Sequence, residues 1–303
     1  AANGKGALTV GEAASDGSPA NIGAVTVGGN IGASDRALQS LTINGSTVSV
    51  VSGSVYAQNV DLNRGALSLS KGKELVIGAG AAGLASSING AKVEADKLTV
   101  KASSTGSLDI LGGAQVDVGT LSVTSAVDVV VGDSNAGATV LADKFVFKGG
   151  KLVVDPEYGK PASKIVVDNI TDTKTEIDAK IAGDILIGQN SVVSIGYAQT
   201  EFDDVMADYL VQNGGFSDQK DGSVKNGVQN ALLLNKQVTV DTDKGIVLDP
   251  AGTTSPDTLT GSLAKNTLTI KSGSALIVSD EALGANKDQA AIKFAKDVCC
   301  IWF

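Results

Sequence analysis

Short apolar pairs at alternate positions recur along most of this chain, separated by clusters of glycine, serine, asparagine and aspartate. A period of two predicts β-strands, because successive side chains of a strand point to opposite faces. Strands this short cannot form a core alone, so their regular return predicts stacked repeats. Within residues 98–154 the pairs are Leu98/Val100, Leu108/Ile110, Val116/Val118, Leu121/Val123, Val129/Val131, Phe145/Phe147 and Leu152/Val154.

The residue between two apolar partners is often polar, as in Thr42, Ser68, Asp109 and Asp117. These residues would face away from the core, so the pattern predicts a polar outer surface. Glycines in the spacers, such as Gly132, supply the positive φ that a tight corner requires. We therefore expect many short strands joined by corners every few residues.

The apolar pairs that begin at Leu8, Val25, Leu41 and Val60 return at nearly regular intervals, with further strands between or after them. A repeat of about 16 to 20 residues that holds two or three short strands is typical of a β-helical coil. The sequence thus predicts an all-β solenoid, with one continuous elongated body. At ~4.8 Å per coil its length would be on the order of 60 to 70 Å.

Three regions follow from the pattern: solenoid coils over residues 1–196, an insertion over 197–235, and further coils over 236–303. In the insertion, Phe202, Met206 and Tyr209 follow helical spacing, which predicts a short, partly helical segment packed on the solenoid or projecting from it. The segment is either a contact module or a cover for apolar surface, and its amphipathic stripe favours the cover. The candidate binding residues are Phe202, Asp203, Asp204, Tyr209 and Phe216.

The net charge of -9 argues against nucleic acids and anionic membranes as partners, since the electrostatic interaction would be repulsive. No continuous apolar stretch is long enough to span a bilayer, so we expect no membrane-spanning helix. The chain has no histidine, the commonest general base and transition-metal ligand. The adjacent Cys299 and Cys300 cannot close a useful loop. We expect no enzyme activity and no cofactor.

Two acidic pairs are candidates for catalytic or metal-binding chemistry. Asp203/Asp204 and Asp241/Asp243 could serve glycoside cleavage, but no arginine, histidine or aromatic platform accompanies them, so they are interpreted as solvated loop charge. Asp241/Asp243 and Asp168 also lack the spacing of known calcium-binding loops. The sequence therefore predicts no catalytic residue and no metal ligand.

Four stretches, SLTINGSTVSV, TLTIKSGSALIVSD, ALSLSKGKELVIG and DILIGQNSVVSIG, carry a resemblance to a known family. With the low cysteine, proline and aromatic content, they resemble the passenger domains of autotransporter adhesins, the type V secreted proteins of Gram-negative bacteria. The resemblance implies a right-handed parallel β-helix, exported through the periplasm and presented at the cell surface. It also implies adhesion, cell aggregation or biofilm formation, with the chain itself on neighbouring cells, or a host glycan or protein, as the partner.

Two other functions stay open on the same fold. A polysaccharide-acting enzyme would need an acidic groove with a basic catalyst, for which lysine is the only plentiful residue. A structural surface-layer or fibre subunit would polymerise into a lattice or filaments instead of bridging cells.

Overall fold

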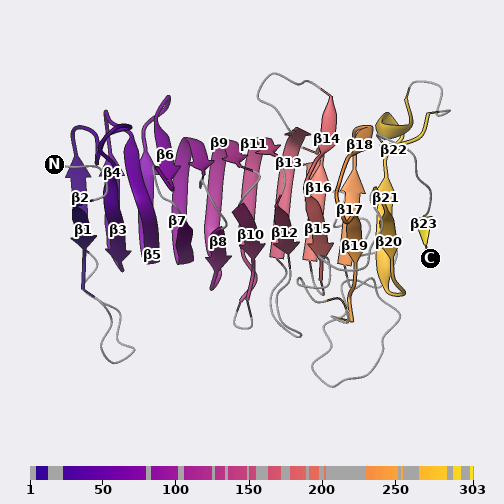
Figure 1. Ribbon diagram of the computed structural model, residues 1–303, viewed down its shortest axis with the longest axis horizontal. Helices are drawn as coiled ribbons and strands as arrows, with labels where there is room; N and C mark the ends of the chain where they lie inside the picture. Colours follow the sequence, from indigo (N-terminus) through magenta and orange to yellow (C-terminus); the bar gives the residue numbers. More distant parts are fainter. Residues whose placement is uncertain are drawn as a thin grey trace.

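The chain forms a rod whose strands lie across its long axis, with the two chain ends at opposite ends of the rod (Figure 1). Within the described part, no helix is long and apolar enough to cross a membrane. The computed structural model describes residues 5–12, 23–79, 83–101, 106–124, 127–133, 136–148, 150–154, 163–171, 178–188, 191–197, 201–202, 230–251, 254, 266–284, 289–294 and 301–302.

The rod is a parallel β-helix, which confirms the predicted fold. Within the described ranges, all paired strands run parallel, in one twenty-stranded sheet and one three-stranded sheet. The long strand β7 (Leu84–Val100) shows how a turn is built, because it passes through three faces in succession. Its Ile88 pairs with Ile110 on the first face, Val93 with Val116 on the second, and Leu98 with Leu121 on the third.

The first face stacks eleven of the described strands in register. In order they are β1 (Ala7–Val10), β3 (Leu38–Asn44), β5 (Val55–Leu69), β7, β8 (Gly106–Leu111), β10 (Val127–Val131), β12 (Lys151–Val154), β15 (Asp184–Ile187), β19 (Ile246–Leu248), β20 (Leu268–Ile270) and β23 (Ile301–Trp302).

The second face stacks β2 (Ala24–Val27), β4 (Thr47–Val50), β5, β7, β9 (Gln115–Val123), β11 (Thr139–Phe147), β13 (Ser163–Thr171), β16 (Ser191–Ile195), β17 (Asn230–Leu234) and β21 (Ser274–Val278). The third face uses parts of β5, β7, β9, β11 and β13 together with β6 (Glu74–Ile77). It continues as the separate sheet of β14 (Ala179–Ile181), β18 (Val238–Val240) and β22 (Ile292–Phe294), and a 3-10 helix, η2, covers Glu281–Leu283.

Many turns are longer than the predicted repeat. The pairing of Leu41 with Val60 has the predicted spacing, but the pairing of Val140 with Ile165 spans a longer stretch of chain. Val25 lies on the second face, so it is not a return of Leu8 on the first. The predicted repeat was too short because it counted some strands on different faces of one turn as if they were successive turns. With ~4.8 Å between layers, the described strands of the first face span about 50 Å, less than the predicted length.

At two places the chain leaves a face and re-enters the same face one layer further on. On the second face, β16 pairs directly with β17, although Ser191 and its partner Asn230 are far apart in sequence. On the first face, β19 pairs directly with β20 in the same way. β17 falls within the predicted insertion of residues 197–235, yet it belongs to the stack and is buried throughout.

The core is one continuous column of inward-facing aliphatic side chains along the rod. Its largest fully buried side chains are Phe145 and Phe147, whose ring centroids lie 5.1 Å apart in a stacked arrangement. Aromatic residues are only 4% of the chain, which suits an interior that most turns fill with valine, leucine and isoleucine. The predicted narrow aliphatic core thus accommodates one aromatic pair at β11.

One corner between the first and second faces requires left-handed backbone in successive turns. Gly45, Gly90 and Gly112 have φ of 62°, 60° and 62°, and Arg64 occupies the corresponding corner with φ of 61°. A side chain in this conformation costs about 1 kcal/mol or more. Arg64 is therefore a strained residue at a position suited to glycine.

Exchanging residues at this corner should change stability in opposite directions. We expect Arg64→Gly to raise the free energy of unfolding by roughly 0.5 kcal/mol, because relief of strain exceeds the added freedom of the unfolded chain. Gly90→Ala would place its Cβ 3.3 Å from the Gly112 carbonyl oxygen, a tight contact, and should lower stability by about 1 kcal/mol, mainly through its φ. Denaturant unfolding would measure both. If Arg64→Gly lowers the free energy of unfolding, the interpretation of Arg64 as a strained residue is wrong.

Candidate functional site

The outer surface of the second face changes character along the rod. In the N-terminal turns the outward residues are polar, which confirms the predicted exterior there. In the C-terminal turns most of them are apolar, and all are buried or half-buried, so the prediction of a polar exterior is wrong for that part. In register, this outward row reads Thr26, Ser49, Ser68, Glu94, Asp117, Leu141, Val166, Ser194, Leu233 and Ile277.

Phe202 explains part of this change. It is only 4% exposed and packs against the outside of the second face with Tyr197, Val166 and Leu233. The Lys164 ammonium group lies 5.7 Å from the centre of its ring. The Phe202 ring therefore acts as a cover for apolar surface, the interpretation that the helical stripe favoured. The other candidate binding residues, Asp203, Asp204, Tyr209 and Phe216, lie outside the described residues.

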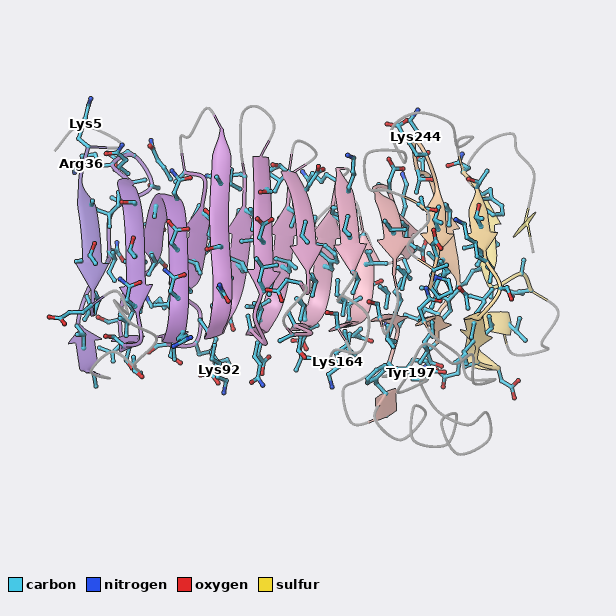
Figure 2. The ribbon with its side chains drawn as sticks, turned by 90° about the horizontal axis from the view of Figure 1, so that it is seen from below. Lys5, Arg36, Lys92, Lys164, Tyr197 and Lys244 are labelled. Atoms are coloured by element: carbon cyan, nitrogen blue, oxygen red, sulfur yellow. The ribbon has the colours of Figure 1, made fainter. Side chains whose placement is uncertain are left out.

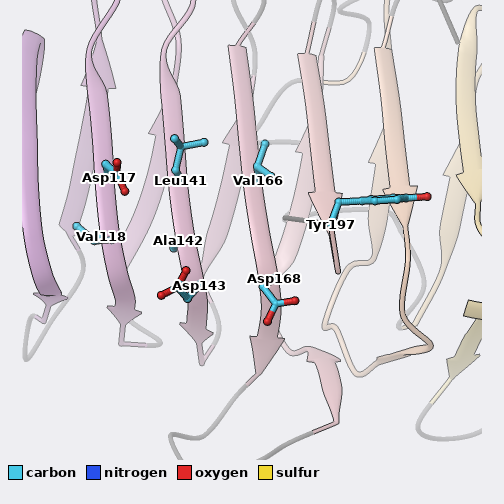
Figure 3. Close-up of a pocket in the computed structure, with 8 residues that line it drawn as sticks. All are labelled: Asp117, Val118, Leu141, Ala142, Asp143, Val166, Asp168 and Tyr197. Atoms are coloured by element: carbon cyan, nitrogen blue, oxygen red, sulfur yellow. The ribbon is translucent and has the colours of Figure 1, made fainter. Parts of the chain in front are cut away.

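Beside this cover, the second face is hollowed. A hollow of about 400 Å³ adjoins a more open one of about 580 Å³, with which it shares Asp168 and Tyr197. A third, of about 270 Å³, shares Asp117 and Leu141 with the first. We call the first hollow the second-face groove; it is lined by Asp117, Val118, Leu141, Ala142, Asp143, Val166, Asp168 and Tyr197 (Figure 3).

The groove has an aliphatic floor and an acidic rim. Val118, Ala142 and Val166 are buried and Leu141 is half-buried, whereas the three aspartates are exposed. Figure 3 shows Asp117, Leu141 and Val166 in one row across β9, β11 and β13, with Asp143 and Asp168 in a second row on β11 and β13. The β-helix register brings these residues together, since Leu141 pairs with both Asp117 and Val166.

The carboxylates of the rim differ in their partners. Asp168 is paired, because the Lys236 Nζ lies 2.8 Å from its Oδ1 and also donates to its backbone carbonyl. Among the described residues, neither Asp117 nor Asp143 makes a hydrogen bond or an ion pair. The groove therefore presents two negative charges that no neighbouring group in the described part neutralises by direct contact.

At the N-terminal side of the groove, two charged residues neutralise one another. The Lys92 Nζ lies 2.6 Å from Glu94 Oε1, and the Ser68 hydroxyl donates to Glu94 Oε2 at 2.6 Å. These two hydrogen bonds, that from Lys92 foremost, lower the pKa of Glu94. Glu94 also raises the pKa of Lys92, with a smaller contribution from Asp117. Lys92 is thus engaged by Glu94, and Figure 2 shows it on the same side of the rod as Lys164 and Tyr197.

Tyr197 closes the other end of the groove. It is 7% exposed, and its hydroxyl points away from the three aspartates (Figure 3). Burial raises the pKa of Tyr197, although a hydrogen bond with Ser279 acts against this shift. Its ring therefore serves as an apolar end wall and offers no open face to a ligand.

Of the two acidic pairs singled out in the sequence, Asp203/Asp204 lies outside the described residues, and Asp241/Asp243 lies within them. Asp241 forms an ion pair with Lys180 at 3.1 Å, and Asp243 also has a partner. No group of three or more acidic residues or cysteines in the described ranges could hold a metal ion. Asp168, which was weighed only as a calcium ligand, lies on the groove rim.

Sequence reasoning did not identify the groove. The sequence did contain a signal for it. Leu141 and Val166 are apolar, whereas Asp117 and Ser68, which lie at the equivalent outward position of other turns, are polar. Comparisons with protein-family models, with curated protein sequences and with solved structures found no match to this chain. The fold and this surface are therefore the features of the chain that indicate its function.

Proposed function

We propose that this chain is the non-catalytic contact region of a bacterial cell-surface adhesin of the autotransporter type. It would mediate cell aggregation, biofilm formation or host attachment through many weak polar contacts along a rigid rod. The observation that carries the proposal is the contrast on the second face: polar, accessible outward residues in the N-terminal turns and a covered apolar surface in the C-terminal turns.

Multivalency would give such a rod its adhesive strength. A single polar contact such as one through Thr26 or Ser49 contributes little, but a β-helix repeats such side chains about every 4.8 Å on a stiff support. Many copies on one cell then multiply weak contacts into firm attachment. Because the row is repetitive, it suits recognition of another repetitive surface, of which a second copy of the chain is the simplest.

A settling assay tests the proposal. Bacteria that display the chain would be mixed one to one with labelled non-displaying cells, and we expect the displaying cells to clump and to exclude the labelled cells. If no clumping occurs, self-association is not the main role. If labelled cells enter the clumps in equal numbers, the contact is not homotypic, and a ligand on the other cell becomes the partner to seek.

Matched variants would locate the face that makes contact. Thr26→Glu with Ser49→Glu adds two negative charges to the second face, and Thr9→Glu with Thr42→Glu adds two to outward positions of the first face. We expect slower clumping for the second-face pair, because repeated like charges repel across a contact between copies. If both double variants clump as fast as the parent chain, neither of these two faces makes the contact.

A further inference from the structure

The second-face groove combines two features that together define one kind of ligand. Asp117 and Asp143 are exposed carboxylates with no hydrogen bond or ion pair among the described residues. Directly beside them, Leu141 is half-buried over a floor of Val118 and Val166. A negative rim around an aliphatic floor fits a ligand that is both positively charged and apolar along part of its length.

The arrangement of the carboxylates favours an extended organic cation over a metal ion. The described acidic residues do not converge on one point in groups of three or more. Asp117, Asp143 and Asp168 come from three adjacent strands, so Asp117 and Asp168 are about 10 Å apart along the rod. The charges are thus distributed along a groove, and a ligand that satisfies them must also be elongated.

Lysine and arginine side chains have the required chemistry. Their methylene stems pack on apolar surface while the charged group reaches a polar rim. Arginine can also form a two-point contact with a carboxylate. Anionic ligands would be repelled by the rim, and Tyr197 is too buried to offer a ring face on which a sugar could stack.

We infer that the second-face groove binds a lysine- or arginine-bearing segment of a partner polypeptide. The basic groups contact Asp117 and Asp143, and a methylene stem lies on Leu141 and Val166. Asp168 contributes less, since Lys236 already pairs with it. This site rests on the proposed function, because it names the chemistry of the partner in adhesion. It is tested on purified protein, so its failure is distinguishable from a failure of cells to clump.

The test is fluorescence anisotropy with a labelled eight-residue peptide of alternating lysine and threonine, at physiological ionic strength. We expect saturable binding to the purified chain. The double variant Asp117→Asn/Asp143→Asn should raise the dissociation constant at least about tenfold, because charge-assisted contacts are lost. Leu141→Ser should raise it about threefold, because the stem loses its apolar surface.

A matched control removes two negative charges elsewhere. Glu12→Gln/Asp35→Asn changes exposed residues at the N-terminal end of the rod and should alter the dissociation constant less than about twofold. Equal weakening by both double variants would show only attraction to the net charge and would overturn the inference. An unchanged dissociation constant for Leu141→Ser would also overturn the inference. So would spermine that binds as tightly as the peptide and whose affinity does not change in the Asp117→Asn/Asp143→Asn variant. Circular dichroism would confirm that each variant is folded.

Discussion

Replacing Lys271 with methionine should lower the free energy of unfolding by about 3 kcal/mol or more. Asp249 follows β19 and Lys271 follows β20, so the two residues occupy the same position in adjacent layers of the first face. The Lys271 Nζ lies 2.7 Å from Asp249 Oδ2 and donates to the Thr254 hydroxyl at the same distance. The Asp249 side chain is 0% exposed, so the variant would leave a buried carboxylate without its cation.

Lys236→Met is the matched control for this prediction. Lys236 also pairs with an aspartate, Asp168, at 2.8 Å, but both side chains are substantially exposed. Exposed ion pairs contribute about 0 to 1 kcal/mol, so this variant should unfold almost as the parent does. Denaturant unfolding followed by circular dichroism would compare the two. Equal losses of stability would contradict the assignment of Lys271 as the structural partner of the buried Asp249 carboxylate.

Phe147→Ala should destabilise the rod by about 3 to 5 kcal/mol. Phe147 is fully buried, stacks on Phe145, and supports the main chain at Gly183, where an added Cβ would lie 2.0 Å from its ring. Removing the ring would leave a cavity between turns that the strand hydrogen bonds prevent from closing. The effect should exceed that of truncating an ordinary valine of the core.

Phe147→Leu separates loss of volume from loss of the aromatic ring. It retains most of the apolar volume, so we expect a loss of only about 1.5 kcal/mol. Thermal or denaturant unfolding of the two variants would be compared. If alanine costs no more than leucine, Phe147 does not fill the interior in the way that its burial indicates.

The fold could be predicted from the sequence because the period of two is a local property. Each pair such as Leu98/Val100 shows by itself which side of a strand is buried. The length of a turn could not be predicted in the same way. Leu8 and Val25 look like successive repeats, but the corners between them decide which face each strand joins, and corner geometry depends on residues far apart in sequence.

The groove was harder to predict, because its residues meet only through the register of the stack. Asp117, Leu141 and Val166 are each separated by a full turn of the chain and become neighbours when β9, β11 and β13 pair. Without that register, an aspartate between two valines looks like ordinary exterior charge. Phe202 was identified from its helical spacing, but only the structure shows that its ring is buried against the outside of the second face.

The direct pairing of β16 with β17, and of β19 with β20, has a consequence for how such a rod can vary. Because the hydrogen-bonded layers join across these points, the length and composition of the intervening chain are decoupled from the register of the stack. Evolution, or protein engineering, can therefore exchange residues 203–229 or 255–265, which leaves the buried Phe202 and Asp249 in place, while every layer keeps its neighbours. The rod is therefore a scaffold with two positions at which polypeptide segments of different length and sequence can be inserted.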